Sequence, residues 1–326
     1  MFLEFNKNKI LSKYTIDKEI GQGVYSKVYK CHLTKDITKS FAIKIYRNDE
    51  FYKKAGEKET QILLQLKNKK RFPQLYDYFI HNNHVILVQD FLPKNLESLV
   101  LNKCTYGLHK IKFIAKELLH GINELQNLTY PIIHADLKLD NLIVTGNNIK
   151  IIDFSNALYL DNQCIKLFKN IYYTFFTKEP DYVQARPYRA PEVILEINYL
   201  DKIDIWSLGC ILVELFIGKY LFDSKYDIGH LDIIVTLLGS DNVLDTIPYL
   251  GSDILQKYFT LIHNGNYIYK KQFYSYPSNT LRRILLDANI LNENLEEFID
   301  FLKCIFIINP YNRPSASQLL EHKFLE

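Results

Sequence analysis

The first ninety residues alternate apolar and polar positions in the way that half-buried strands do. From Tyr14 to Tyr46 the alternation runs through a Gly-x-Gly turn and predicts three antiparallel strands. The period becomes helical between Phe51 and Leu66, and two further strand-like runs follow at 74–80 and 84–91. The pattern therefore predicts a small antiparallel sheet of five strands with one helix.

After Leu92 the pattern becomes mainly helical. A helix is expected from Leu108 to Leu128, short strands near 142–144 and 149–152, and mostly helix towards the end of the chain. Residues 153–192 have no clear period. Because unstructured loops longer than about 15 residues are uncommon unless functional, this segment is interpreted as a regulatory or substrate-binding loop.

Length and composition narrow the class of protein. The 326 residues fit two lobes that share a cleft, and we divide them into residues 1–91 and 92–326. The net charge of only +3 gives no reason to expect nucleic acid as a partner. The apolar run at 205–218 is too short to span a bilayer and is interpreted as a buried core helix, so no membrane partner is expected. Five scattered cysteines favour an intracellular location, in the nucleus or cytoplasm.

Two features of the first ninety residues suit phosphate binding. The turn Gly21-Gln22-Gly23 lets backbone N–H groups approach phosphate oxygens, although a simple hairpin would look the same. Lys44 follows on a strand, and Glu59 precedes the apolar run of the predicted helix. A lysine held by a carboxylate can present its charge to a nucleotide. Glu57 competes with Glu59 for this position, and two solvated surface charges are the alternative.

A denser cluster of polar residues lies in the middle of the chain. Asp136, Lys138 and Asn141 fall within six residues, and Asp153 follows between hydrophobic strands. Phosphoryl transfer needs such a set: a carboxylate to orient the hydroxyl, a cation for developing charge, and oxygen ligands for Mg²⁺. A surface turn rich in Asp and Asn is the alternative.

Further blocks downstream argue against that alternative. They are Arg186-Pro187-Tyr188-Arg189-Ala190-Pro191-Glu192, Asp204-Ile205-Trp206-Ser207-Leu208-Gly209-Cys210 and Asn309-Pro310-Tyr311-Asn312-Arg313-Pro314. Taken in order with the earlier motifs, they resemble the complete signature series of eukaryotic protein kinases, as one domain over residues 14–325. The resemblance implies an α+β, bilobal fold: a small five-stranded antiparallel sheet with one helix, and a larger, mainly helical lobe.

The resemblance also implies a role for each motif residue, with ATP and Mg²⁺ as cofactors. Asp136 corresponds to the catalytic aspartate, Lys138 to the lysine that reaches the transferring phosphate, and Asn141 and Asp153 to the Mg²⁺ ligands. The residues expected around the nucleotide are Gly21, Gln22, Gly23, Val28, Ala42, Lys44, Glu59, Gln89, Asp90, Leu92 and Ile143. Those expected to support the large lobe are Asp204, which braces the catalytic loop, and Glu192 and Arg313, which form a buried ion pair.

Within the kinases, the segment 182–192 resembles the CMGC group, near its DYRK, HIPK and pre-mRNA-processing-kinase branches. That resemblance implies Ser/Thr phosphorylation and a self-installed phosphotyrosine at Tyr182, whose charge Arg186 or Arg189 would pair. A core tyrosine that packs the loop is the alternative. The aromatic residues of 161–180 favour a packed insertion over a docking surface.

Four positions depart from the usual kinase pattern: Ser26, Ala135, Leu139 and Ser155. None removes a Mg²⁺ ligand or a charged catalytic group. Ala135 replaces the arginine that would bind a phosphothreonine, which favours the phosphotyrosine hypothesis. Ser155 replaces a glycine, and its Cβ is expected to restrict movement of the preceding metal-binding aspartate.

Three function classes follow from the motifs: an active Ser/Thr or dual-specificity kinase, a nucleotide-binding pseudokinase scaffold, and a kinase-shaped enzyme that acts on a small molecule. The complete set of charged catalytic residues argues against the scaffold, and Ala190-Pro191-Glu192 with the helical lobe after it favours protein acceptors. The expected partners are protein substrates, Pro-directed or Arg/Ser-rich at their Ser/Thr sites, with the enzyme itself a monomer.

Overall fold

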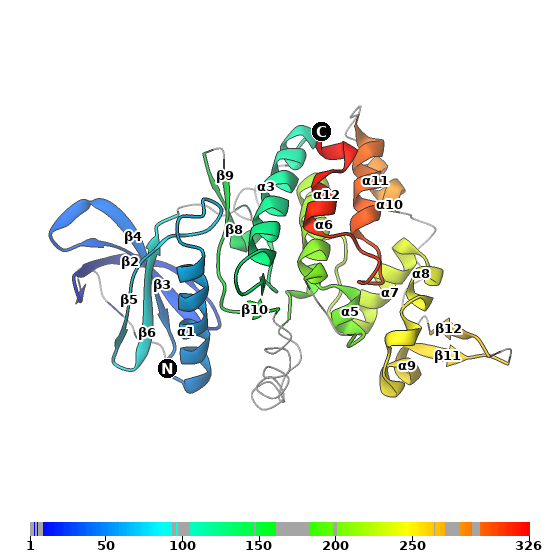
Figure 1. Cartoon of the computed structure of the whole chain (residues 1–326), viewed down its shortest axis with the longest axis horizontal. Coiled ribbons are helices and arrows are strands. Elements are labelled where there is room, and N and C mark those ends of the chain that lie inside the picture. Colours follow the sequence, from blue (N-terminus) through cyan, green and yellow to red (C-terminus); the bar gives the residue numbers. More distant parts are fainter. Residues whose placement is uncertain are drawn as a thin grey trace.

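Figure 1 shows the computed structural model of the chain. The residues that the structure describes are 3, 5, 9–92, 96, 105–146, 148–160, 183–197, 201–263, 265–270, 281–288 and 294–326. Tyr182 and the segment 161–180, for which predictions were made above, lie outside these residues.

The N-terminal part forms one antiparallel sheet with strand order β1-β2-β3-β4-β6-β5. The strands are β1 (Ile10–Leu11), β2 (Tyr14–Gln22), β3 (Ser26–Leu33), β4 (Asp36–Tyr46), β5 (Leu75–His81) and β6 (His84–Asp90). The predicted number of five strands is therefore wrong by one. The extra strand, β1, is two residues long and pairs with the start of β2, so it is too short to show any alternation of its own.

Helix α1 (Glu50–Gln65) lies along this sheet, where the helical period predicted it (Figure 1). Its inward face carries Ala55, Ile62 and Leu63, together with the carboxylate residue Glu59. The helix approaches the sheet closely at Gly56, where a Cβ would come within 2.8 Å of the Tyr46 ring. This contact fixes the distance between Glu59 on the helix and the neighbouring strand β4.

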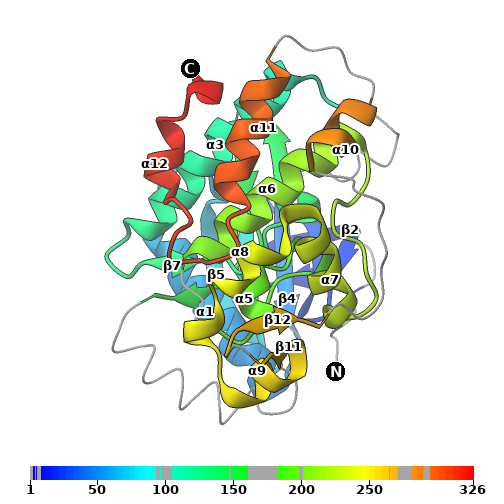
Figure 2. The ribbon, with the colours of Figure 1, turned by 90° about the vertical axis from the view of Figure 1, so that its right-hand side faces the viewer.

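The C-terminal part is built around α6 (Lys202–Ile217), in which every residue from Ile203 to Phe216 is buried. This confirms the prediction of a buried core helix. Helices α3 (Leu108–Gln126) and α11 (Leu295–Ile305) pack against it, as Figure 2 shows from the helical side. At Gly209 a Cβ would lie 2.5 Å from Ile305, so α6 and α11 can cross this closely only because a glycine is present.

Short elements carry the polar motifs between the sheet and the helices. They are β7 (Ile132–Ile133), η1 (Leu139–Asn141), β8 (Leu142–Thr145), β9 (Asn148–Ile151), β10 (Leu158–Tyr159), η3 (Arg186–Tyr188) and α5 (Pro191–Ile194). Strand β8 pairs with β9, and β7 pairs with β10, both antiparallel. These pairings place the segments around Asp136 and Asp153 next to each other.

The remaining described elements extend the helical lobe. They are α7 (Asp227–Leu238), α8 (Ser240–Leu244), η4 (Ile247–Tyr249), α9 (Ser252–Tyr258), α10 (Leu281–Asp287), α12 (Ala316–Leu320), η5 (Lys323–Leu325) and the strands β11 (Phe259–Leu261) and β12 (Tyr267–Tyr269). The β11–β12 hairpin was not predicted. None of the described helices is both long and apolar enough to cross a membrane.

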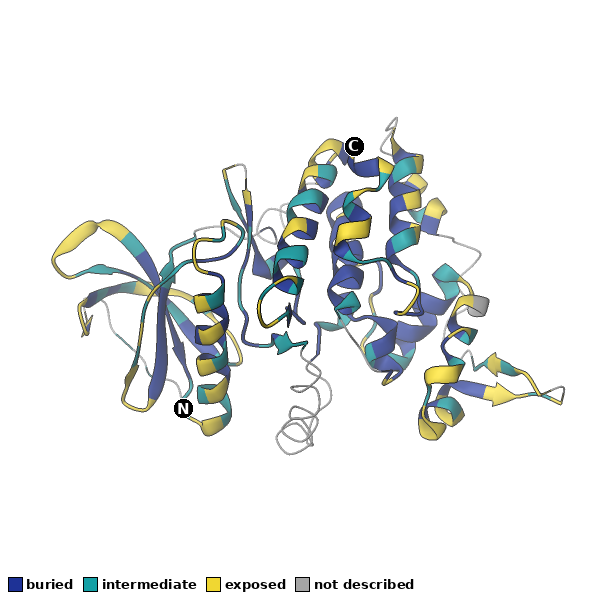
Figure 3. Cartoon of the chain, in the orientation of Figure 1, coloured by how far each residue is buried: buried dark blue, intermediate teal, exposed yellow. Residues whose placement is uncertain are grey.

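The buried residues form two clusters, and Figure 3 shows buried positions both in the sheet and in the helices. One cluster lies within the sheet and contains Tyr29, Ile43 and Val88. The other runs from the α1 side of the sheet into the helical lobe and joins Leu63 to Phe154. Because this second cluster spans both lobes, the position of α1 is tied to the residues beside Asp153.

Candidate active site

The glycine turn joins β2 to β3 through a hydrogen bond from the Gly23 N–H to the Ser26 carbonyl, 2.9 Å long. A Cβ at Gly21 would meet no atom within 4 Å, and one at Gly23 would only reach Ser26 at 4.0 Å. The protein itself therefore does not require glycine here for packing. A Cβ would instead fill space next to the backbone N–H groups, which is the space that a phosphate would need.

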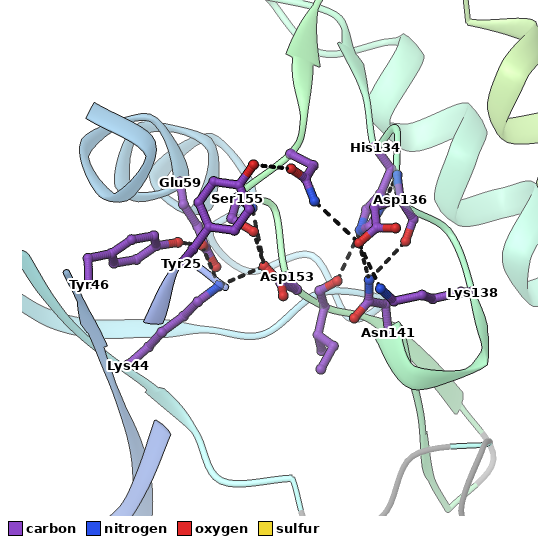
Figure 4. A network of polar contacts seen from close by, with 12 residues as sticks. Tyr25, Lys44, Tyr46, Glu59, His134, Asp136, Lys138, Asn141, Asp153 and Ser155 are labelled. Carbon is purple, nitrogen blue, oxygen red and sulfur yellow. Dashed lines mark hydrogen bonds and ion pairs between the residues drawn. The ribbon is translucent and has the colours of Figure 1, made fainter. Parts of the chain in front are cut away.

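Lys44 on β4 ion-pairs with two carboxylates at once (Figure 4). Its Nζ lies 2.6 Å from Glu59 Oε2 and 2.7 Å from Asp153 Oδ1, and the lysine is 3% exposed. Burial alone would lower the pKa of Lys44, but the charges of Asp153 and Glu59 outweigh it and raise the pKa above its usual value. The ammonium group thus stays charged although it is buried.

Glu59, and not Glu57, faces this site. Glu59 is fully buried and also accepts a hydrogen bond from the hydroxyl of Tyr46, whereas Glu57 is exposed. The second oxygen, Oε1, is buried without a hydrogen-bond partner among the described residues. Two donors therefore fix the carboxylate through one oxygen, and the orientation of Lys44 follows from it.

Asp136 lies between β7 and η1 and is 7% exposed. Lys138 Nζ is 3.1 Å from its Oδ2, and the Asn141 amide donates to the same oxygen at 3.3 Å and to the Asp136 carbonyl at 2.8 Å. Burial opposes the charge of Lys138, but the neighbouring carboxylate of Asp136 prevails and raises its pKa. The structure thus brings three of the predicted site residues into one group.

The loop that carries Asp136 is held by hydrogen bonds to Asp204, a residue of α6. Asp204 accepts hydrogen bonds from the backbone N–H groups of His134, at 2.7 Å, and Ala135, at 3.0 Å. Ala135 has a φ of 61°, which is unfavourable for a residue with a Cβ. The two hydrogen bonds to Asp204 hold this conformation. Burial raises the pKa of Asp204 to about 7, although the two backbone donors oppose the shift.

Asp153 also has a left-handed backbone, with a φ of 67°. Its Oδ1 accepts from Lys44 and from the hydroxyl of Ser155 at 2.6 Å. Burial would raise the pKa of Asp153, but Lys44 and Ser155 hold it well below its usual range. Ser155 is not among the described non-glycine residues with positive φ, so its Cβ causes no backbone strain here. Its hydroxyl supplies a contact that glycine could not make.

The residues predicted to surround the adenine lie on neighbouring strands. In the sheet register, Val28 is opposite Lys44, and Ala42 is opposite Gln89, so these four side chains share one face. Ile143 lies on β8 and is 6% exposed. Both oxygens of the Asp90 carboxylate are bound to other groups, namely Lys150 at 3.1 Å, Tyr76 at 2.9 Å and the Gln74 N–H at 3.1 Å. Leu92 follows as a half-buried residue.

The two arginines predicted to pair with a phosphotyrosine share an acidic partner. Arg189 is 4% exposed, contacts Asp227 at 2.8 Å, and donates to the carbonyls of Val183 and Gln184. Arg186 contacts the same Asp227 oxygen at 3.2 Å, with 36% of its side chain exposed. Arg186 is therefore the more accessible of the two.

The sequence analysis missed several residues that the structure brings into or beside the site. Tyr25 and Asn156 hydrogen-bond to each other at 2.7 Å, and Asn156 also reaches Asp136. Gln184 has a φ of 61°, and its buried amide bonds to Ile203, Ser207 and Ala190. An amide or an aromatic that stands outside a closely spaced set of charged residues has no chemistry that singles it out in a sequence. Only the position of Asn156, directly after the Asp153 motif, could have drawn attention to it.

Comparison with known proteins agrees with this geometry. The model of the protein kinase domain matches residues 14–325, and the chain belongs to that family. It is 32% identical to the serine/threonine-protein kinase ppk15 of Schizosaccharomyces pombe and 28% identical to the serine/threonine-protein kinase prpf4B of Dictyostelium discoideum, over 96% and 100% of the chain. It is also 29% identical to the dual specificity protein kinase YAK1 of Saccharomyces cerevisiae, over 96% of the chain.

These relatives confirm the resemblance to CMGC kinases near the DYRK and pre-mRNA-processing branches. The match to the protein kinase domain confirms the bilobal kinase fold. The chain spans 62%, 41% and 42% of the length of the three proteins, so the similarity covers only part of each of them.

Proposed function

We propose that this chain transfers the γ-phosphoryl group of Mg²⁺-bound ATP to the hydroxyl of a serine or threonine in a protein substrate. One observation supports this most directly: Lys44 is held by Glu59 and Asp153 together, at 2.6 and 2.7 Å. The three residues come from β4, α1 and the segment after β9. An arrangement that holds a buried lysine between two carboxylates, one of them partly exposed, is suited to position a polyphosphate and its metal ion.

The donor set fits Mg²⁺. The contacts of Asp153 within the described residues all involve Oδ1, which leaves Oδ2 for a metal ion. Asn141 points its amide nitrogen at Asp136, so its oxygen faces away and can act as a ligand. No group of three or more acidic, His or Cys side chains that could hold a metal occurs in the described ranges. A site made of one oxygen each from Asp153 and Asn141 suits Mg²⁺, which is usually bound by one or two protein carboxylates together with substrate phosphates.

In this proposal the nucleotide lies under the sheet. Gly21, Gln22 and Gly23 would contact the phosphates through their backbone, and bound Mg²⁺ would offset the phosphate charge. Adenine would lie between Val28 and Ala42 on one side and Ile143 on the other, as the shared strand face supports. Gln89 would limit access behind it, and the backbone of Asp90 and Leu92 would bind its edge.

Asp136 and Lys138 would act at the acceptor hydroxyl. The side-chain contacts of Asp136 in the described part of the chain all use Oδ2, so Oδ1 is left to accept the hydroxyl proton or orient the hydroxyl group. Lys138 carries a charge 3.1 Å from Oδ2 and would offset charge on the moving phosphoryl group.

The proposal extends to the regulation of the kinase and to the class of its protein substrates. Tyr182 would be autophosphorylated, and Arg186, which is partly exposed, would pair with the added charge better than the buried Arg189. Some of the relatives are named as dual-specificity kinases, which agrees with such a reaction. We further propose Pro-directed or Arg/Ser-rich protein substrates, a monomeric enzyme, and a location in the nucleus or cytoplasm.

The test is transfer of radiolabelled phosphate from ATP with Mg²⁺ to three acceptors: the chain itself, myelin basic protein and an Arg/Ser-rich peptide. We expect transfer by the wild type and none by Asp136→Asn, which keeps the shape of the side chain but cannot accept a proton. Asp253→Asn changes an exposed aspartate in α9 and should transfer as the wild type does. Transfer by Asp136→Asn at the wild-type rate would contradict the proposal. Absence of transfer by the wild type would also contradict it.

A further inference from the structure

A chain of two hydrogen bonds links the glycine turn to the catalytic loop (Figure 4). The Tyr25 hydroxyl lies 2.7 Å from Asn156 Oδ1, and Asn156 Nδ2 lies 3.3 Å from Asp136 Oδ2. Tyr25 belongs to the turn between β2 and β3, and Asn156 follows the Asp153 segment. The two residues are 131 positions apart in the sequence. Nothing in the motif analysis assigned a role to either of them.

The charge of Asp136 fixes the direction of this chain. An ionised carboxylate only accepts hydrogen bonds, so the end of the Asn156 amide that faces Asp136 must be the nitrogen. The amide oxygen then faces Tyr25, whose hydroxyl must donate to it. The donor and acceptor roles are therefore determined by chemistry, and a hydroxyl on Tyr25 in this position favours the amide orientation that Asp136 needs.

The ring of Tyr25 is held in place by α1. It stacks on Phe51 with ring centroids 6.0 Å apart and meets Tyr52 edge-on at 5.6 Å. Both aromatic residues belong to the first turns of the helix that carries Glu59. The ring that carries this hydroxyl is therefore packed against the same helix that brings Glu59 to Lys44.

From this geometry we propose that Asn156 is a positioning residue for Asp136, and that Tyr25 controls it by closing the glycine turn. Asn156 is the third donor to Asp136 Oδ2, beside Lys138 and Asn141, and is the one that responds to the glycine turn. The carboxylate is then fully aligned only when the turn is closed over the nucleotide site. The inference rests on the proposed function, because it concerns the alignment of the residue that would act on the hydroxyl.

The experiment compares Tyr25→Phe, Asn156→Leu and the double variant with the wild type. Asn156→Leu removes a hydrogen bond to a charged group and should lower kcat about 10-fold, while the KM for ATP stays nearly constant. Tyr25→Phe removes a neutral hydrogen bond and should lower kcat about 3- to 5-fold. If Tyr25 acts through Asn156, the double variant should match Asn156→Leu alone. Tyr52→Phe is the matched control, since it removes a hydroxyl from the same aromatic cluster and should leave kcat unchanged.

Hydrogen exchange of the peptide that covers residues 20–27 supplies a readout that does not depend on activity. Without nucleotide, Tyr25→Phe and Asn156→Leu should both speed exchange in this peptide, and Tyr52→Phe should not. Unchanged exchange in the first two variants, or losses in kcat that multiply in the double variant, would overturn the inference. Faster exchange in these two variants, together with no phosphate transfer by the wild type, would refute the proposed function while leaving the link from Tyr25 to Asn156 intact.

Discussion

Arg313 and Glu192 form a two-point ion pair between residues 121 positions apart in the chain, and both side chains are completely buried. Arg313 Nη1 donates to Glu192 Oε1 at 2.6 Å and Nη2 donates to Oε2 at 2.9 Å. The guanidinium also donates to the carbonyls of Ile307 and Lys202. The pair thus connects α5, which carries Glu192, to the first residue of α6 and to the segment before α12.

Arg313→Met should lower the free energy of unfolding by about 3–5 kcal/mol, because it leaves Glu192 buried without its cation. Urea denaturation followed by fluorescence measures the change. Arg282→Met is the matched control: Arg282 also pairs with a glutamate, at 2.6 Å, but the two side chains are 53% and 67% exposed. That control should cost less than about 1 kcal/mol. Equal losses in the two variants would show that burial of the Glu192 pair does not matter.

Asp153→Asn should reduce phosphate transfer by more than about 100-fold, because it weakens both Mg²⁺ binding and the charge that faces Lys44. The measurement is the rate of transfer at saturating ATP over a series of Mg²⁺ concentrations. Asp36→Asn, at an exposed position near the start of β4, should follow the wild-type curve. An unchanged rate in Asp153→Asn would refute the metal-binding role of this residue.

Ser155 offers a sharper test, since the sequence and the structure suggest different effects. The sequence predicts that the Cβ restricts Asp153, in which case Ser155→Gly would differ from Ser155→Ala. The structure shows a 2.6 Å hydrogen bond from the Ser155 hydroxyl to Asp153, which both variants remove. We expect both to raise the Mg²⁺ concentration needed for half-maximal rate by about 10-fold, as loss of a supporting hydrogen bond commonly does.

Titration of the two Ser155 variants with Mg²⁺ distinguishes these effects. Similar curves for alanine and glycine would assign the role to the hydroxyl. A glycine variant that binds Mg²⁺ better than the alanine variant would show that the Cβ is the important feature, as the sequence predicts.

Much of the fold could be predicted because its strands and helices carry regular patterns. The strands around the glycine turn and the helix that bears Glu59 are long enough for a period to appear. The two-residue β1 and the three-residue strands β11 and β12 are too short for that. Their formation depends on pairing with a neighbour, which the local sequence does not encode.

The candidate site also contains residues that the sequence predicted and residues that it did not. Asp136, Asn141 and Asp153 were found because carboxylates and amides at fixed spacing carry chemistry that the sequence displays. Tyr25 and Asn156 were not found, because their contact joins segments that only the folded chain brings together. Gln184 was missed for a similar reason. Its hydrogen bond to the Tyr188 carbonyl joins residues four positions apart, but its hydrogen bonds to Ile203 and Ser207 reach a different element, α6.

Tyr188 and Glu214 provide a prediction about pH. The Tyr188 hydroxyl donates to Glu214 Oε2 at 2.5 Å and ties η3 to α6. Burial raises the pKa of Glu214 from 4.5 to about 7, although the hydrogen bond from Tyr188 opposes the shift. Between these two values the folded chain holds a proton that the unfolded chain releases. The stability contributed by this proton is therefore fully present below pH 4.5 and is lost as the pH rises through about 7.

Glu214→Gln lacks this titration, so its stability relative to the wild type should improve as the pH rises from 4.5 to about 7, by at most about 1.4 kcal/mol per pH unit. Urea denaturation of both proteins at several pH values gives the difference. Other groups, such as the buried His230, change the stability of both proteins alike and cancel in that difference. Glu321→Gln, at an exposed position, should run parallel to the wild type. If Glu214→Gln also ran parallel, Glu214 would not hold a proton in the folded state, and its bond to Tyr188 would be that of an ionised carboxylate throughout this range.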